Sequence, residues 1–242
     1  MKVVVIIPAA GLGTRMAPAS KTERKKPRAS KQFFELGGTP VLIHTLRKFA
    51  ACPEVSEIYI ALRADEIAGF RLRLEKETKD FSCQKIELVE GGEHRQQSVT
   101  RAMAAVSATP DDLVLVHDAV RPFVTAEIIH DVIEAAGKYG AAIAGMPAMD
   151  TVKQVERTSE GAVITATLPR ERVVMAQTPQ GFRYSVLKKA FDEATADGFL
   201  GTDEASLVER SGHKVAVVMG SPRNIKITTP ADMELAEFFL KR

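Results

Sequence analysis

The chain begins with an uninterrupted run of β-branched residues, Val3 to Ile7, which ends at a turn rich in small residues. A strand with no polar alternation is buried on both faces, as happens in parallel sheets that carry helices on each side. Similar runs recur at 58–62, 86–89, 113–116, 141–145 and 215–219, with amphipathic helical patterns between them. We therefore expect an α/β fold in one domain over residues 1–242, with a doubly wound, mostly parallel sheet.

Capping residues mark the ends of the helices expected between these strands. Ser or Thr at an N-cap, Pro at the first helical position and Gly just past the last one are typical of helix ends. The expected starts are Thr39-Pro40, Thr125, Ser185 and Thr229-Pro230, and the expected stop of the third helix is Gly198. Thr202 is expected to cap a further helix that carries Asp203 and Glu204 in its first turn.

One segment breaks the alternation of strands and helices. Residues 151–156 and 162–168 are typical of two strands joined by a turn, with no helix between them. A hairpin alone is marginally stable, so this one is expected to pack on another element. We expect a β-hairpin arm at about 148–172 that packs on a second subunit and forms a homodimer. An antiparallel extension of the main sheet is the alternative.

The charge and cysteine content argue against several classes of protein. The chain has 33 Lys and Arg against 31 Asp and Glu, which gives no overall reason to expect a nucleic acid or a membrane as partner. Its two cysteines, Cys52 and Cys83, form no CxxC pair, so neither a disulfide framework nor a zinc site is expected. No run of eighteen apolar residues is present. We expect a soluble, cytoplasmic protein.

The turn after the first strand, Pro8 to Met16, has the composition of a phosphate-binding loop. Its small residues let the backbone approach a ligand, and successive N–H groups can cradle phosphate oxygens. A dinucleotide-binding fingerprint needs a third Gly or Ala where Met16 stands, and a Walker A loop needs Gly-Lys-Ser or Gly-Lys-Thr. Arg15 and Lys31 place two cations beside this loop, which suits a triphosphate. The alternatives are a solvated Arg15 and a nucleic-acid role for the basic segment 20–31.

A set of motifs in one order carries a family resemblance across essentially the whole chain. The motifs are PAAGLGTRM (8–16), KQF (31–33), GG (91–92), HDAVRP (117–122), DTVK (150–153), QTPQ (177–180), TDEAS (202–206) and NIKIT (224–228). With them the chain resembles the 2-C-methyl-D-erythritol 4-phosphate cytidylyltransferases of non-mevalonate isoprenoid biosynthesis. The resemblance implies a Rossmann-like nucleotidyltransferase fold, a homodimer, and Mg²⁺ bound with CTP.

The implied reaction is attack by the phosphate of 2-C-methyl-D-erythritol 4-phosphate on the α-phosphorus of CTP. It releases pyrophosphate and forms 4-diphosphocytidyl-2-C-methyl-D-erythritol. The resemblance implies Arg15, Lys31 and Lys226 as catalytic residues. It implies nucleotide binding by Pro8, Ala9, Ala10, Gly11, Gly13, Gly92, Ser98 and Asp118. It implies substrate binding by Asp118, Arg121, Thr151 and Arg170, of which the last two reach across a dimer. Asp118 would also meet the metal, directly or through water.

Several assignments stay open at the level of the sequence. Ser98 could be an ordinary helix hydroxyl. The other competitors are Arg121 as a plain ion-pair partner of Asp118, Arg172 in place of Arg170, and Lys21, Lys25 or Lys26 in place of Lys31. The alternative functions are a ribitol 5-phosphate cytidylyltransferase and a non-catalytic nucleotide-binding module. Turnover of the two alcohol phosphates with CTP separates the first of these from the expected reaction.

Overall fold

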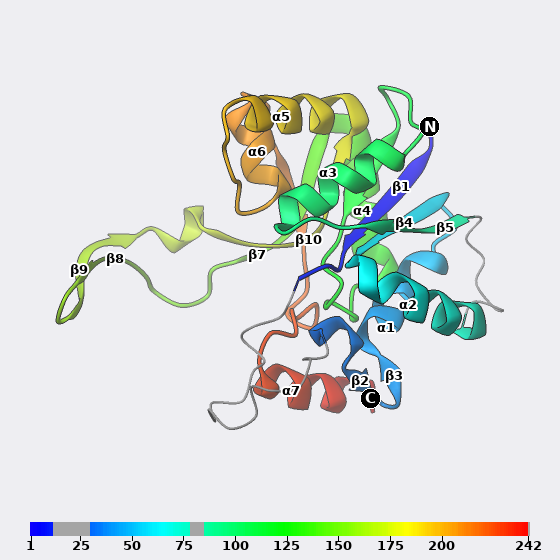
Figure 1. The fold of residues 1–242 in the computed structure, drawn as a ribbon. Coiled ribbons are helices and arrows are strands. Elements are labelled where there is room, and N and C mark those ends of the chain that lie inside the picture. The colour runs from blue at the N-terminus through cyan, green and yellow to red at the C-terminus, as the bar shows by residue number, and fades with distance from the viewer. Residues whose placement is uncertain (12–29, 78–84, 242) are drawn as a thin grey trace.

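The computed structural model of the chain describes residues 1–11, 30–77 and 85–241. Within these ranges seven strands form one sheet in the order β11-β7-β10-β6-β1-β4-β5 (Figure 1). The strands are β1 (Val3–Pro8), β4 (Glu57–Leu62), β5 (Lys85–Glu90), β6 (Leu113–Val116), β7 (Ala141–Pro147), β10 (Val174–Arg183) and β11 (Ala216–Met219). Neighbouring strands run parallel except at β10, which is antiparallel to β6 and β7. The predicted doubly wound, mostly parallel sheet is confirmed.

Helices cover both faces of this sheet, which explains why the first strand has no polar alternation. The helices are α1 (Val41–Ala50), α2 (Ala64–Glu77), α3 (Arg95–Ala105), α4 (Ala126–Tyr139), α5 (Tyr184–Ala196), α6 (Glu204–Arg210) and α7 (Pro230–Leu240). Val3, Val5 and Ile7 of β1 belong to an apolar cluster with residues of α1, α2 and α4. Val4 and Ile6 face the other way and belong to a cluster with residues of α3, α5 and α6. None of the described helices is long and apolar enough to cross a bilayer.

The predicted helix ends are confirmed in part. Thr125 and Thr229 accept hydrogen bonds from Ile128 N and Asp232 N, as N-caps do. Gly198, the expected stop after α5, has a φ of +65°, a conformation that glycine adopts without strain. The third helix, α5, begins at Tyr184, one residue before the predicted start at Ser185.

Two predicted N-caps are wrong. Thr39 and Pro40 form the short strand β3 (Thr39–Pro40), which pairs with β2 (Glu35–Leu36). Because the Phe34 carbonyl accepts from Val41 N, α1 begins at Val41 and has no side-chain cap. The cap of α6 is Asp203 and not Thr202, since the Asp203 carboxylate accepts from Ser206 N at 3.0 Å.

The antiparallel strand β10 is an element that the sequence patterns did not predict. Pro179 has no N–H for the sheet and Gly181 has no side chain to pack, so the segment lacks a strand signature. Its pairing with β7 accordingly shifts register between Ala176 and Gln180. Because Gln180 pairs with Val116, β10 lies beside the carboxyl end of β6.

The predicted hairpin is present and projects away from the sheet (Figure 1). Strands β8 (Val152–Thr158) and β9 (Gly161–Leu168) pair only with each other among the described strands, so the arm is not an extension of the seven-stranded sheet. The turn is shorter than the sequence suggested, because Thr158 pairs with Gly161. The arm exposes the large apolar side chains of Val155, Val163 and Ile164.

Candidate active site

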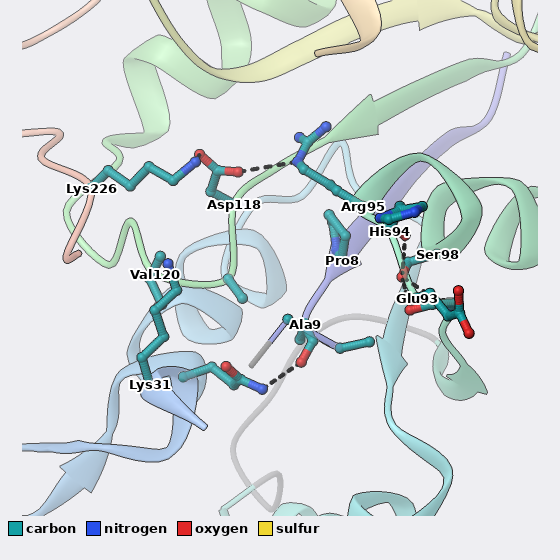
Figure 2. A pocket seen from close by; sticks show the side chains of 15 residues that line it. Pro8, Ala9, Lys31, Glu93, His94, Arg95, Ser98, Asp118, Val120 and Lys226 are labelled. Carbon is teal, nitrogen blue, oxygen red and sulfur yellow. Dashed lines mark hydrogen bonds and ion pairs between the residues drawn. The ribbon is translucent and has the colours of Figure 1, made fainter. Parts of the chain in front are cut away.

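A pocket of about 210 Å³ lies at the carboxyl edge of the sheet, where ligands bind in open α/β folds. It gathers predicted residues that are far apart in sequence, and Figure 2 shows their side chains. The predicted residues that line it are Pro8, Ala9, Ala10, Gly11, Lys31, Gly92, Ser98, Asp118 and Lys226. Pro8 ends β1, Gly92 follows β5 and Asp118 follows β6, so three neighbouring strands deliver them to one edge. Gly13 and Arg15 lie outside the described residues.

Lys31 reaches the pocket from a short 3₁₀ turn, Lys31–Phe33, that is anchored on both sides. Gln32 is buried, and its amide Nε2 donates to the carbonyl of Ala9 at the end of β1. Ser30 donates to Glu66 Oε1 at 2.6 Å. The lysine is therefore carried by a segment tied both to the small-residue turn and to α2.

The turn after β5 packs tightly against the small-residue turn. A Cβ at Gly91 would lie 2.5 Å from Ala10 Cβ and 3.0 Å from Ser98 Oγ, so only glycine fits there. Ser98 is buried, accepts from Gly92 N at 3.0 Å and donates to the His94 carbonyl at 3.2 Å. The hydroxyl thus stabilises the turn while it lines the pocket, so both interpretations of Ser98 remain compatible with its position.

Asp118 is the electrostatic centre of the pocket. Its Oδ2 lies 2.9 Å from Lys226 Nζ and 3.1 Å from Arg121 Nε, and its Oδ1 lies 3.4 Å from Arg95 Nε. In Figure 2 Lys226 and Arg95 approach the carboxylate from opposite sides. Burial alone would raise the pKa of Asp118, but the charges of Arg95, Lys226 and Arg121 outweigh burial and hold the pKa far below its usual range. The carboxylate is therefore ionised at neutral pH.

A buried hydrogen-bond network supports Asp118 from behind. Thr178 Oγ1 accepts from Asp118 N at 3.0 Å and lies 3.1 Å from His117 Nδ1. His117 Nε2 lies 3.1 Å from the Arg121 carbonyl, which can only accept, so Nε2 carries the proton and Nδ1 accepts from Thr178. Burial lowers the pKa of His117 to about 4, in keeping with this neutral form. Asn224 donates to the Thr178 carbonyl at 2.9 Å and so ties the segment that carries Lys226 to β10.

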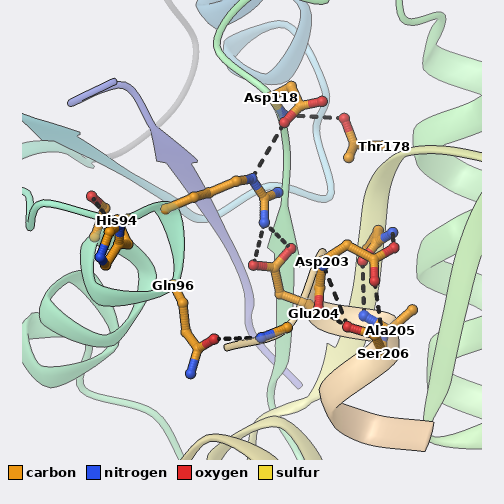
Figure 3. Close-up of polar contacts among 12 residues, drawn as sticks. His94, Gln96, Asp118, Thr178, Asp203, Glu204, Ala205 and Ser206 are labelled. Carbon is orange, nitrogen blue, oxygen red and sulfur yellow. Dashed lines mark hydrogen bonds and ion pairs between the residues drawn. The ribbon is translucent and has the colours of Figure 1, made fainter. Parts of the chain in front are cut away.

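Arg95 and Glu204 are site residues that sequence reasoning missed. Arg95 begins α3 and lines the pocket, and its Nη1 lies 2.5 and 2.7 Å from the two carboxylate oxygens of Glu204. Glu204 is 1% exposed in the first turn of α6 (Figure 3). The TDEAS motif drew attention to this segment, but no local pattern pairs it with Arg95.

Three predicted substrate-binding residues are not among the described residues that line the pocket. Arg121 lies against Asp118 and also donates to the Asn224 carbonyl at 2.7 Å. Thr151 is exposed at the base of the arm. Arg170 is exposed in the 3₁₀ turn Arg170–Arg172 and donates to the Met149 carbonyl at 2.8 Å. Their roles therefore stay predictions.

The described residues do not form a resident metal site. No three His, Cys, Asp or Glu side chains come together among them in a way that could hold an ion. Both oxygens of Asp118, the predicted metal contact, already face cations. A divalent ion would therefore depend on phosphate oxygens and water, the ligands that Mg²⁺ commonly keeps at nucleotide sites.

Comparisons with known proteins agree with this architecture over the full length. Residues 3–242 match the family model for 2-C-methyl-D-erythritol 4-phosphate cytidylyltransferase. The proteins of that name from Acidobacterium capsulatum and Solibacter usitatus are 58% and 54% identical, over 100% of this chain and 98% and 96% of theirs.

Solved structures give the same result for the fold. A 4-diphosphocytidyl-2C-methyl-D-erythritol synthase from Anaerococcus prevotii has a TM-score of 0.81 at 31% identity, covering 100% of this chain and 96% of its own. The 2-C-methyl-D-erythritol 4-phosphate cytidylyltransferase from Thermus thermophilus has a TM-score of 0.75 at 33% identity, with both chains fully covered. The chain belongs to the 2-C-methyl-D-erythritol 4-phosphate cytidylyltransferase family.

Proposed function

We propose that the pocket at the carboxyl edge of the sheet is where this nucleotidyltransferase performs its reaction. The chain transfers a cytidylyl group from CTP to 2-C-methyl-D-erythritol 4-phosphate, which forms 4-diphosphocytidyl-2-C-methyl-D-erythritol for isoprenoid biosynthesis. The observation that carries the assignment to this pocket is the ammonium of Lys226, fixed 2.9 Å from the buried Asp118 carboxylate beside a turn of small residues.

Catalysis at this pocket rests on position and charge. The nucleophile is a phosphate oxygen that is already anionic, so the chain needs no general base to activate it. The reacting phosphorus gathers negative charge, and cations fixed in advance lower the barrier because they need not reorganise during the reaction. Lys226 and Lys31 line the pocket on separate elements and supply two such charges. Arg15 is the third proposed cation, on the basis of the family motif.

CTP lies, in this proposal, with its triphosphate on the turn from Pro8 to Gly11 and its base toward Gly92 and Ser98. Backbone groups without side chains allow the close approach that phosphate oxygens require. The turn at Gly91-Gly92 offers carbonyl acceptors that suit the exocyclic amine of cytosine. Mg²⁺ accompanies CTP as a charge-neutralising ion on the phosphates, and it needs no protein ligand set of its own.

The acceptor site is completed by a second copy of the chain. Thr151 and Arg170 lie on or beside the arm, away from the pocket of their own chain. The exposed apolar side chains of Val155, Val163 and Ile164 suit burial against a partner, which a lone two-stranded arm needs for stability. We therefore propose a homodimer in which each arm brings Thr151 and Arg170 to the acceptor phosphate at the neighbouring pocket. Cytoplasmic location, with no nucleic acid or membrane as partner, is part of the same proposal.

Pyrophosphate release from CTP tests the acceptor most directly. With Mg²⁺ present, 2-C-methyl-D-erythritol 4-phosphate is expected to support turnover, and ribitol 5-phosphate at the same concentration is expected to give little. Both acceptors carry the same phosphate and differ in the alcohol, so the comparison isolates recognition of the alcohol. Faster turnover with ribitol 5-phosphate would contradict the proposed substrate.

A further inference from the structure

Arg95 connects two carboxylates that belong to different layers of the molecule. Its Nη1 lies 2.5 and 2.7 Å from the two oxygens of Glu204, and its Nε lies 3.4 Å from Oδ1 of Asp118. Glu204 begins α6, whereas Asp118 follows the central strand β6 (Figure 3). The guanidinium therefore forms a bridge between the pocket and a helix on one face of the sheet.

The Glu204 end of this bridge is rigid. The Glu204 carboxylate is 1% exposed, so water does not compete for its oxygens. Its helix is fixed by the Asp203 cap and by Gln180 Oε1, which accepts from Ala205 N at 3.0 Å. Leu207 and Val208 of the same helix belong to the apolar core. The position of the guanidinium is thus set by a packed helix.

The Asp118 end of the bridge selects which oxygen meets Lys226. Oδ1 faces Arg95, and Oδ2 faces both Arg121 and Lys226. A carboxylate that is free to rotate about its terminal bond could present either oxygen. With Oδ1 engaged by Arg95, the plane of the carboxylate is fixed and Oδ2 is directed at the ammonium of Lys226.

We propose that Arg95 is a positioning residue: Glu204 holds its guanidinium, and the guanidinium orients Asp118 so that Lys226 is held at the reacting phosphate. This inference rests on the role proposed above for Lys226. The donors Nε and Nη1 of Arg95 already face carboxylates, and the charge of Glu204 balances that of Arg95. A direct contact of Arg95 with substrate phosphate is therefore not its main contribution.

The first test uses two substitutions that disturb the bridge with little change in volume. Glu204→Gln removes the charge that holds Arg95, and Arg95→Lys keeps the charge but loses the planar fork that reaches two carboxylates at once. Each variant is expected to lower kcat by about 30-fold, because a displacement of about 1 Å at a reacting group can cost on the order of 10²-fold. The KM for CTP is expected to change by less than about threefold, since the phosphate-binding turn is untouched.

Matched controls are available on the same helix. Arg210 Nη2 lies 2.7 Å from Asp197 Oδ2, a distance similar to that of the buried pair, but both side chains are partly exposed and neither lines the pocket. Arg210→Lys and Asp197→Asn are expected to leave kcat and KM unchanged. Unchanged kcat in Glu204→Gln and Arg95→Lys, or an equal loss in the controls, would overturn the proposal.

A double-mutant cycle separates this proposal from the role of Lys226. If Arg95 acts by holding Lys226 in place, Arg95→Lys is expected to lower kcat by less than about twofold in a chain that already carries Lys226→Ala. Multiplied losses would overturn the role of Arg95 and leave that of Lys226 intact. Full kcat in Lys226→Ala alone would instead refute the proposed role of Lys226, and the positioning role of Arg95 with it.

A further variant covers the case in which the single substitutions impair folding. Arg95→Met with Glu204→Leu removes both charges together, so that neither is left buried without its partner. This chain is expected to unfold in one cooperative transition yet to show the same loss of about 30-fold in kcat, because Asp118 lacks its guide. Wild-type kcat in this folded double variant would show that the pair only stabilises the fold, and would overturn the proposal.

Discussion

Lys226 Nζ lies 2.9 Å from Oδ2 of Asp118, at the edge of the sheet where the small-residue turn opens. A lysine side chain carries about 2 kcal/mol of rotamer entropy, so an unpaired lysine would not stay in one place. Asp118 is ionised because neighbouring cations hold its pKa low, and it therefore restrains the ammonium before any substrate arrives. Such preorganisation is the main way in which a site can accelerate phosphoryl transfer to an anionic nucleophile.

The close contact of the two turns predicts a specific effect of Gly91→Ala. The new Cβ would lie 2.5 Å from Ala10 Cβ and 3.0 Å from Ser98 Oγ, so one turn must move away from the other. We expect the KM for CTP to rise about tenfold with a smaller change in kcat, together with a loss of about 1–3 kcal/mol in the free energy of unfolding. Steady-state kinetics and urea unfolding measure the two effects.

Gly69→Ala is the matched control for this prediction. Gly69 lies in α2, and a Cβ there would meet no atom within 4 Å. The control is expected to keep its kinetics and to gain up to about 1 kcal/mol of stability from helix propensity. Equal KM values for CTP in Gly91→Ala and the wild type would show that the contact between the turns does not shape the nucleotide site.

Base selection is expected to depend on the exocyclic amine of cytosine. Backbone carbonyls near Ala10 and the Gly91-Gly92 turn can accept from that amine, whereas UTP would face them with another acceptor. Buried acceptors without a donor reject the wrong ligand strongly, so kcat/KM for CTP should exceed that for UTP by at least about 10³-fold. Competition between the two nucleotides in one assay measures the ratio, and equal values would reject this model of base selection.

The buried His117 predicts how stability depends on pH. The unfolded chain binds this proton near the ordinary pKa of 6.5, whereas burial lowers the folded pKa to about 4. The contribution of neutral His117 is therefore fully present above pH 6.5 and is lost as the pH falls toward 4. The loss amounts to about 3 kcal/mol at 1.36 kcal/mol per pH unit.

Urea unfolding of the wild type and of His117→Gln between pH 7 and pH 4 measures this contribution. The carboxylates titrate in both proteins, so the difference between the two curves isolates the histidine. The stability of the variant is expected to fall by about 3 kcal/mol less than that of the wild type over this range. Parallel curves would contradict the neutral, buried state of His117.

Local patterns predicted those parts of the fold and site that follow directly from a strand. The apolar run of β1 is buried on both faces, and Pro8, Gly92 and Asp118 reach one pocket because three neighbouring parallel strands end there. Asp118 could be located from the sequence since it comes two residues after a clearly patterned strand.

Other features could not be predicted because they depend on tertiary packing. Arg95 and Glu204 are 109 residues apart in the chain, and only the packing of α3 and α6 on one face of the sheet brings them together. β10 was missed for a different reason, since Pro179 and Gly181 are accommodated by a register shift that no periodicity announces. The Thr39 cap failed because the preceding β2–β3 pair already satisfies the first amide of α1.

The proposed shared acceptor site predicts complementation between two inactive chains. Arg170→Ala and Lys226→Ala homodimers should each be nearly inactive, because each lacks one component at both sites. In a mixed dimer one site carries both defects, and the other combines an intact Lys226 with an intact Arg170. Activity is expected to rise on subunit exchange to roughly a quarter of wild type, if half of the dimers are mixed and each has one good site.

Native mass spectrometry of the same mixture shows whether mixed dimers have formed. Arg210→Ala mixed with Lys226→Ala is the control for nonspecific effects of exchange, since Arg210 lies away from both the pocket and the arm. No recovery of activity in the presence of confirmed mixed dimers would place Arg170 in the site of its own chain.

The central claim is that the ammonium of Lys226 stabilises the transition state of cytidylyl transfer at this pocket. It is tested most directly by kcat for pyrophosphate release from CTP and 2-C-methyl-D-erythritol 4-phosphate in Lys226→Ala, beside Lys189→Ala, whose lysine is exposed on α5 and lies 3.8 Å from Glu193. The account predicts a loss of about 10²–10³-fold, equivalent to about 3–4 kcal/mol, with CTP affinity by calorimetry changed less than tenfold and the control unchanged. A kcat within about twofold of wild type in Lys226→Ala would contradict it.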